Sequence, residues 1–204
     1  MDFLNRKTLE MGLSFLATSD PDLAGILTKF GPPPIWARKS GFSTLIHIIL
    51  EQQVSLASAR AAFDRLVKAT SPLTPERFLA LDDDALKVIG FSRQKAGYGR
   101  ELARSVVEGR LDFSALAKLD DAAVRVELTS LKGIGAWTAD IYLLMVLRRP
   151  DIWPRGDLAL ATAAQKVKRL DSRPTQAELD AMSLAWRPWR AVAARLLWHY
   201  YLSQ

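Results

Sequence analysis

The stretch LKGIGAWTADIYLL, residues 131–144, decides the fold that we expect for this chain. Gly133 and Gly135 stand one residue apart, permit positive φ and let another backbone come close, so they predict a tight hairpin. An amphipathic segment, Asp121–Thr129, leads into the hairpin, and an apolar segment, Trp137–Leu147, leads out of it. The pattern therefore predicts a helix, a Gly-x-Gly hairpin and a second helix.

A hairpin of this kind suits a DNA phosphate. It leaves backbone N–H groups unpaired at the start of the second helix, where the helix dipole also favours an anion. Such a contact reads no base and is independent of sequence. Further along, WPRGDLAL, residues 153–160, places Asp157 at the start of another apolar segment. A carboxylate there can cap the helix, and it is equally well placed to project into a cleft.

These segments together resemble the helix–hairpin–helix (HhH-GPD) glycosylase superfamily, which has a Gly/Pro-rich loop and a catalytic aspartate. Within it, the chain looks most like the 3-methyladenine DNA glycosylase II (AlkA-like) branch. Three further segments are similar to family blocks: LEQQVS at 50–55, GFSRQKA at 90–96 and WRPWR at 186–190. The resemblance covers roughly residues 45–200, most of the chain.

The resemblance implies an all-α fold of two helical lobes with the active cleft between them. One lobe would be the contiguous segment 36–135, which ends in the hairpin, and the other would combine 1–35 with 136–204. The extra N-terminal β domain of larger relatives is expected to be absent. The residues agree with this class, because no segment shows the sustained alternation of a strand and about ten short helices can be counted.

Several helix starts are legible from capping residues. A start is predicted at Ser19-Asp20-Pro21, at the first-turn proline after Thr74, and at a capping box formed by Thr175 and Glu178. We also expect Pro188 to start the last helix. Asp82 and Ser92 are further predicted caps.

Composition narrows the class of protein. The 204 residues are 49% hydrophobic and 25% charged, which is ordinary for a globular chain, and the net charge of +6 permits a polyanionic partner. The absence of cysteine excludes disulfides, cysteine-ligated zinc and an iron–sulfur cluster. The N-terminal residues do not show the basic-then-apolar pattern of a signal peptide, and no apolar run reaches the ~20 residues that span a bilayer. We expect a cytoplasmic, nucleoid-associated monomer with no membrane partner.

Asp157 matches the family's catalytic aspartate. Cleavage of an N-glycosidic bond develops positive charge on the sugar, which a fixed carboxylate stabilises, and the same group can orient or deprotonate water. The alternative is that Asp157 only caps the helix that follows. Where relatives that also cut the strand carry a lysine, this chain has Trp137. The resemblance therefore implies a hydrolase with water as nucleophile and no lyase activity.

Aromatic residues are candidates for the base pocket, because an alkylated purine is cationic and stacks on electron-rich rings. Trp137 and Trp198 match pocket positions of the family, and Tyr142 is a further candidate. Any single tryptophan is more often a core residue, and Trp36 and Trp153 are left undetermined.

Gln53 stands at a break between two predicted helices and matches the family's wedge, the side chain that fills the gap left by a flipped base. The alternative is a turn cap, and for Gln52 we expect a structural hydrogen bond. His47 is expected to be a partly buried core residue. Asp140 is expected to contact the base or to pair with a basic side chain.

Candidates for the DNA backbone are Lys132, Gly133 and Gly135 in the hairpin, and Arg93 and Lys95 at a helix start; each basic one is equally consistent with solvated surface. The resemblance also implies a monovalent cation, Na⁺ or K⁺, on hairpin carbonyls such as those of Leu131 and Gly133. No other cofactor is expected.

The main hypothesis is a monofunctional glycosylase that removes alkylated purines such as 3-methyladenine and 7-methylguanine from double-stranded DNA and so initiates base-excision repair. One alternative is a superfamily enzyme for another lesion, an oxidised or mispaired base. The other is a non-catalytic module that only holds DNA.

Overall fold

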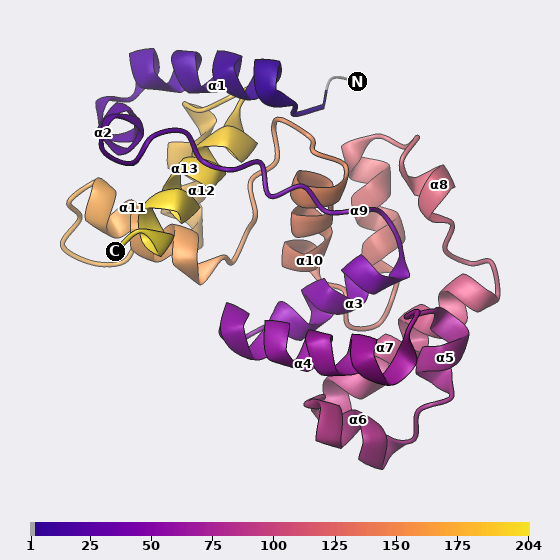
Figure 1. Cartoon of the computed structure of the whole chain (residues 1–204). Coiled ribbons are helices and arrows are strands. Elements are labelled where there is room, and N and C mark those ends of the chain that lie inside the picture. The colour runs from indigo at the N-terminus through magenta and orange to yellow at the C-terminus, as the bar shows by residue number, and fades with distance from the viewer. Residues whose placement is uncertain (1–2) are drawn as a thin grey trace. The chain divides into compact units, whose positions relative to one another are not determined.

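Helices account for the regular structure of residues 3–204, the part of the chain that the computed structural model describes, and no strand occurs there. The predicted all-α class is confirmed. The chain divides into two compact units: unit 1 combines residues 1–37 with 143–204, and unit 2 is the segment 38–142. Figure 1 shows the course of the chain through both.

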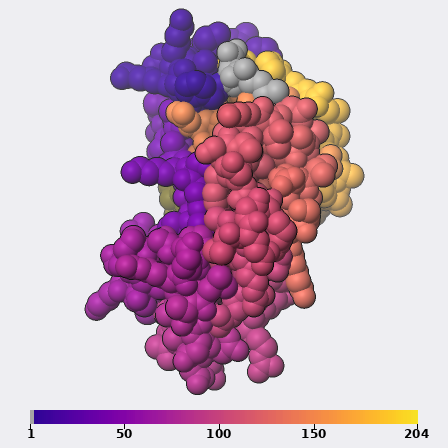
Figure 2. Space-filling model, turned by 90° about the vertical axis from the view of Figure 1, so that its right-hand side faces the viewer, coloured from indigo at the N-terminus to yellow at the C-terminus, as the bar shows by residue number. Residues whose placement is uncertain are grey.

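Unit 2 begins with the most apolar helix of the chain. Its helices are α3 (Phe42–Glu51), α4 (Leu56–Thr70), α5 (Pro75–Leu79), α6 (Asp83–Ile89), α7 (Arg93–Val107), α8 (Phe113–Leu116), α9 (Asp121–Thr129) and α10 (Ala136–Ile141). α3 packs against both α4 and α7, and α5 packs against α7. The segments coloured purple and pink in Figure 2 thus share one surface although they are far apart in sequence.

The core of unit 2 is built on α3. Leu45, Ile46, Ile48 and Ile49 have no exposed surface, and each contributes roughly 1.5–3 kcal/mol by burial. α7 approaches closely enough that a Cβ at Gly99 would lie 2.5 Å from the Phe78 ring of α5. This packing holds the C-terminal end of α3 in a fixed position.

Local capping explains where most of these helices start. Thr74, Asp82 and Ser92 accept hydrogen bonds from backbone N–H groups of the first turns of α5, α6 and α7. The predicted caps at these residues are confirmed.

Both boundaries between the units differ from the predicted ones. The first lies at 37/38 rather than 35/36, so Trp36 belongs to unit 1. The second was predicted at 135/136, but α10 packs against α9 and α3 and therefore belongs to unit 2. The boundary lies at 142/143 instead.

Unit 1 gathers both ends of the chain around its last helix. Its helices are α1 (Arg6–Ser19), α2 (Pro21–Phe30), α11 (Leu158–Val167), α12 (Gln176–Leu184) and α13 (Arg190–Leu202). α13 packs against α11, α2 and α1, and every residue from Ala191 to Trp198 is buried. The capping box predicted at Thr175 is confirmed at the start of α12.

Two helix boundaries differ from expectation. The last helix starts at Arg190 rather than Pro188, because a turn over residues 185–188 comes first. The apolar segment after the hairpin is not one α-helix: α10 ends at Ile141, and a π-helix follows over Tyr142–Val146. A π-helix interrupts the regular hydrogen bonds of an α-helix and so leaves backbone carbonyls available to other donors.

Arg195 uses one of the carbonyls of the π-helix. Its guanidinium is fully buried and donates to the carbonyl oxygens of Leu144, Ile35 and Ala191 at 2.7, 3.0 and 2.9 Å. Burial lowers the pKa of Arg195 to about 9. Arg195 thus ties α13 to residues 31–41, the linker between α2 and α3 that contains Trp36.

Within residues 3–204, no helix is long and apolar enough to cross a lipid bilayer.

Candidate active site

The hairpin between α9 and α10 has the predicted form. The N–H of Ile134 donates to the carbonyl of Leu131 at 3.1 Å, and Gly133 has φ +94. A Cβ at Gly133 would lie 2.0 Å from Cγ of Tyr98, so the position requires glycine both for its backbone and for space. Lys132 and Gly135 are exposed on the hairpin.

The turn that follows α3 is tied to this hairpin by Gln52. Its Nε2 donates to the carbonyl of Gly133 and to Oγ1 of Thr138, both at 2.9 Å. The structural hydrogen bond expected for Gln52 is therefore confirmed. The next residue, Gln53, is exposed and has φ +56, a conformation that costs a non-glycine residue roughly 1–2 kcal/mol.

Lys95 has a different position from the one expected. Its Nζ donates to the carbonyls of Leu50 and Gln52, each at 2.7 Å, and burial lowers its pKa. These carbonyls lie at the C-terminal end of α3, where the helix dipole favours a cation. Lys95 thus holds the turn that bears Gln53. Because its ammonium group is bound to these carbonyls, Lys95 is not assigned to the DNA backbone. Arg93, at the start of α7, is exposed.

The bond from Gln52 bears on the predicted cation site. The Gly133 carbonyl already accepts a side-chain N–H, and that of Leu131 accepts the N–H of Ile134. A backbone carbonyl oxygen has two lone pairs, so these single bonds do not exclude coordination, and the cation at Leu131 and Gly133 stays a prediction. No step below depends on one.

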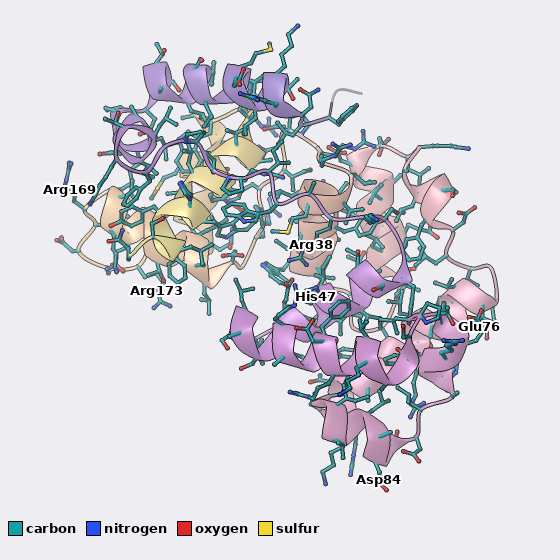
Figure 3. All side chains as sticks on the ribbon, viewed as in Figure 1. Arg38, His47, Glu76, Asp84, Arg169 and Arg173 are labelled. Carbon is teal, nitrogen blue, oxygen red and sulfur yellow. The ribbon has the colours of Figure 1, made fainter. Side chains whose placement is uncertain are left out.

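A second cluster lies at the same end of α3. Arg38 donates to both carboxylate oxygens of Glu51 at 2.9 and 2.7 Å, and His47 Nε2 lies 3.7 Å from Oε1 of Glu51. His47 also stacks on Phe63, with ring centroids 4.2 Å apart, and burial lowers its pKa. Figure 3 labels Arg38 and His47, which extend from the linker and from α3. The core position expected for His47 is confirmed.

Asp157 lies in unit 1, at the start of α11. Its Oδ1 accepts the N–H of Leu160 at 2.9 Å, so it caps α11, as the alternative interpretation required. The same oxygen lies 3.3 Å from Nε1 of Trp198 on α13. Capping and an orienting contact with a tryptophan therefore occur together, and the two interpretations do not exclude one another.

Trp36 completes this group, and sequence reasoning left it undetermined. Its ring meets that of Trp198 edge to face, with centroids 6.4 Å apart. Trp36 is half-buried and has φ +48, while Trp198 is 8% exposed. Unit 1 thus brings one carboxylate and two indole rings together from three segments: the linker, the start of α11 and α13.

The other predicted pocket residues belong to unit 2. Trp137 is half-buried on α10. Tyr142 is 0% exposed, its hydroxyl lies 2.9 Å from Oγ of Ser40, and burial raises its pKa. The structure thus makes Tyr142 a core residue. Asp140 is buried and accepts a hydrogen bond from Nε of Arg125 at 2.7 Å, which matches the expected pairing with a basic side chain.

Comparison with known proteins finds relatives that match most of this chain. The DNA-3-methyladenine glycosylase 1 of Schizosaccharomyces pombe is 28% identical over 193 residues, 93% of this chain and 85% of that protein. A DNA-3-methyladenine glycosylase of Bacillus subtilis is 27% identical over 195 residues. The chain spans about two thirds of two Bacillus subtilis relatives, 66% of one and 64% of the other.

Two solved structures are similar over nearly the whole chain. The Schizosaccharomyces pombe 3-methyladenine DNA glycosylase Mag1, in complex with abasic DNA, has a TM-score of 0.84 and 27% identity, and the match covers 94% of this chain and 95% of that one. A DNA-3-methyladenine glycosidase from Bacillus halodurans has a TM-score of 0.74 and 30% identity, with 97% and 91% covered. Residues 46–190, which include the hairpin and Asp157, match the family model described as HhH-GPD superfamily base excision DNA repair protein, and the chain belongs to this family.

Proposed function

We propose that this chain is a monofunctional DNA glycosylase that hydrolyses the N-glycosidic bond of alkylated purines in duplex DNA. The observation that carries the proposal is the group formed by Asp157, Trp198 and Trp36, in which a carboxylate is oriented by one indole ring and a second ring adjoins the first. The relatives named above are 3-methyladenine glycosylases or glycosidases, which supports the same substrate class.

The leaving group, an alkylated purine, requires little catalytic assistance. A purine alkylated on a ring nitrogen is cationic and departs without a dedicated general acid. The enzyme must instead stabilise the positive charge that develops on the sugar, which we assign to the carboxylate of Asp157. Its hydrogen bonds to Leu160 and Trp198 restrict its rotation, so the charge is positioned before the reaction starts. Water supplies the nucleophile.

Recognition of DNA is assigned to unit 2. We assign the hairpin residues Lys132, Gly133 and Gly135 to a phosphate, with Arg93 as a further basic contact, and Gln53 to the gap that a flipped base leaves. The exposed position of Gln53 and its left-handed backbone support a wedge. In unit 1, the pair Trp36 and Trp198 is assigned to the base pocket. Trp137 of unit 2 stays a candidate for contact with the base.

A panel of lesions tests this function. Duplexes that carry 7-methylguanine, 8-oxoguanine or a mispaired uracil are incubated with excess enzyme, and released bases are identified. We expect release of the methylated purine alone. Release of only the oxidised or mispaired base would replace the substrate class, and binding without any release would favour a module that only holds DNA.

The lack of lyase activity gives a second test. Trp137 cannot form a Schiff base with the sugar, so borohydride reduction during turnover is expected to trap no protein–DNA adduct. The abasic strand should stay intact until it is treated with hot alkali. A trapped adduct that maps to a lysine such as Lys132 would contradict a water-only mechanism.

Trp36→Ala is expected to weaken capture of the cationic base by about 1 kcal/mol, roughly fivefold, because a ring edge of the pocket is lost. The quantity to measure is the single-turnover rate at subsaturating enzyme with a methylated duplex. Trp36→Phe should retain most of the rate, and Phe3→Ala removes an exposed aromatic of the same unit as a control. A Trp36→Ala enzyme with the wild-type rate would exclude the ring from the pocket.

A further inference from the structure

The loop of residues 153–157, which ends in Asp157, is buried at its start and exposed at its bend. Trp153 and Pro154 are buried, and Asp157 caps α11. Between them, Arg155 and Gly156 are exposed, and Gly156 has φ +78. Packing therefore does not fix the bend that immediately precedes the carboxylate.

The start of α12 reaches this bend through Gln176. The N–H of Gly156 donates to Oε1 of Gln176 at 2.6 Å, and Nε2 of Gln176 donates to Oδ1 of Asp180 at 2.8 Å. Arg155 Nε lies 3.3 Å from the other oxygen of Asp180. Both ends of the amide are engaged, which settles its orientation. α12 packs beside α11, the helix that Asp157 caps (Figure 1).

These contacts are not required to form α12. The helix has its own capping box, in which Thr175 and Glu178 exchange hydrogen bonds, and it is anchored by buried Leu179. Gly156 is exposed, so water could satisfy its N–H at little cost. The bond from Gly156 to Gln176 therefore contributes position rather than stability.

We propose that Gln176, held by Asp180, is a positioning residue for Asp157, with the amide acting as a clamp on the bend of the loop. The inference rests on the proposed role of Asp157 in glycosidic cleavage. Gly156 is the residue before Asp157, so a shift of its backbone moves the carboxylate. A misplacement of about 1 Å at a reacting centre can cost about a hundredfold in rate.

Gln176→Ala is the first variant to measure. It removes the acceptor for Gly156, and we expect the single-turnover rate on methylated duplex to fall about ten- to a hundredfold. Affinity for duplex that carries a neutral tetrahydrofuran abasic analogue should stay near the wild-type value, because this ligand does not depend on the carboxylate.

A charged analogue reports the position of Asp157 directly. A pyrrolidine abasic analogue carries a protonated ring nitrogen and mimics the sugar cation, so wild type should prefer it to tetrahydrofuran DNA. Gln176→Ala should reduce this preference in proportion to the rate. A purely structural role would weaken both ligands alike and leave the ratio unchanged.

Two further variants separate the clamp from the helix. Glu178→Ala removes the capping box of α12 but no contact to Gly156, and it should leave rate and ratio near wild type. The double variant Gln176→Glu with Asp180→Asn keeps the net charge and reverses the polarity of the bond between the two side chains. It offers Gly156 an acceptor again and should recover most of the rate.

The outcomes are distinguishable. The proposal is overturned if Gln176→Ala matches wild type in rate and in analogue preference, or if Glu178→Ala loses as much as Gln176→Ala. It is also overturned if the double variant stays as slow as Gln176→Ala. A wild type that releases no methylated purine would remove the proposed function itself, and the clamp with it.

Discussion

Asp157→Asn is expected to lower the single-turnover rate of base release by about a hundred- to a thousandfold, because the charge that stabilises the sugar cation is lost. Asparagine is as good a helix cap as aspartate, so the hydrogen bond from Leu160 should survive. The rate is measured on methylated duplex with enzyme in excess, and the urea midpoint of unfolding is measured beside it.

The stability measurement separates capping from catalysis. Asp157→Ala should cost about 1 kcal/mol of unfolding free energy as well as the activity, whereas Asp157→Asn should cost activity alone. An Asp157→Asn enzyme that folds normally and keeps its full rate would leave Asp157 with only its structural role in α11.

Gly133→Ala is expected to destabilise the chain by about 3 kcal/mol, from the positive φ and from the overlap of the new Cβ with Tyr98. The contact falls on Cγ of the tyrosine, which can move away only by a change of the χ1 rotamer or a shift of the backbone. The same change should displace the Gly133 carbonyl from Gln52 and weaken binding to DNA. Urea unfolding and titration with abasic duplex measure the two effects.

Gly97→Ala is the matched control for Gly133→Ala, because it makes the same substitution at the residue of α7 that precedes Tyr98. A Cβ there meets nothing within 4 Å, and the helix should gain roughly 0.5–1 kcal/mol. The double variant Gly133→Ala with Tyr98→Ala should recover the part of the loss that comes from overlap. Equal stabilities of Gly133→Ala and wild type would show that the hairpin does not require glycine at this position.

Much of the fold could be predicted because its determinants are local. The caps at Thr74, Asp82 and Ser92 act within one turn of their own helices, and Gly133 of the hairpin permits the positive φ of its own backbone. The box formed by Asn5 and Thr8 at the start of α1 is a further cap of this local kind.

The site was less predictable because its contacts join distant segments. The Trp36 ring contacts the Trp198 ring, and the sequence around either residue does not indicate this contact. Lys95 looks like a surface cation until its Nζ is seen on the carbonyls of α3. Gln176 looks like an ordinary first-turn residue until its amide meets Gly156.

The segment after the hairpin shows how tertiary contacts override a local pattern. Its apolar run indicates one continuous helix, but the structure changes to a π-helix at Tyr142. The carbonyl of Leu144 accepts from buried Arg195, and the Tyr142 hydroxyl meets Ser40. Neither Arg195 nor Ser40 can be identified as a partner from the sequence of this segment alone.

The most direct test of the account is product analysis of one turnover on dimethyl sulfate-methylated duplex, with wild type and Asp157→Asn side by side. The account predicts that wild type releases free methylpurine and leaves an unbroken abasic strand, while Asp157→Asn binds the duplex and releases almost nothing. Equal release by both proteins would contradict the central role of Asp157, and release by neither would contradict the proposed substrate class.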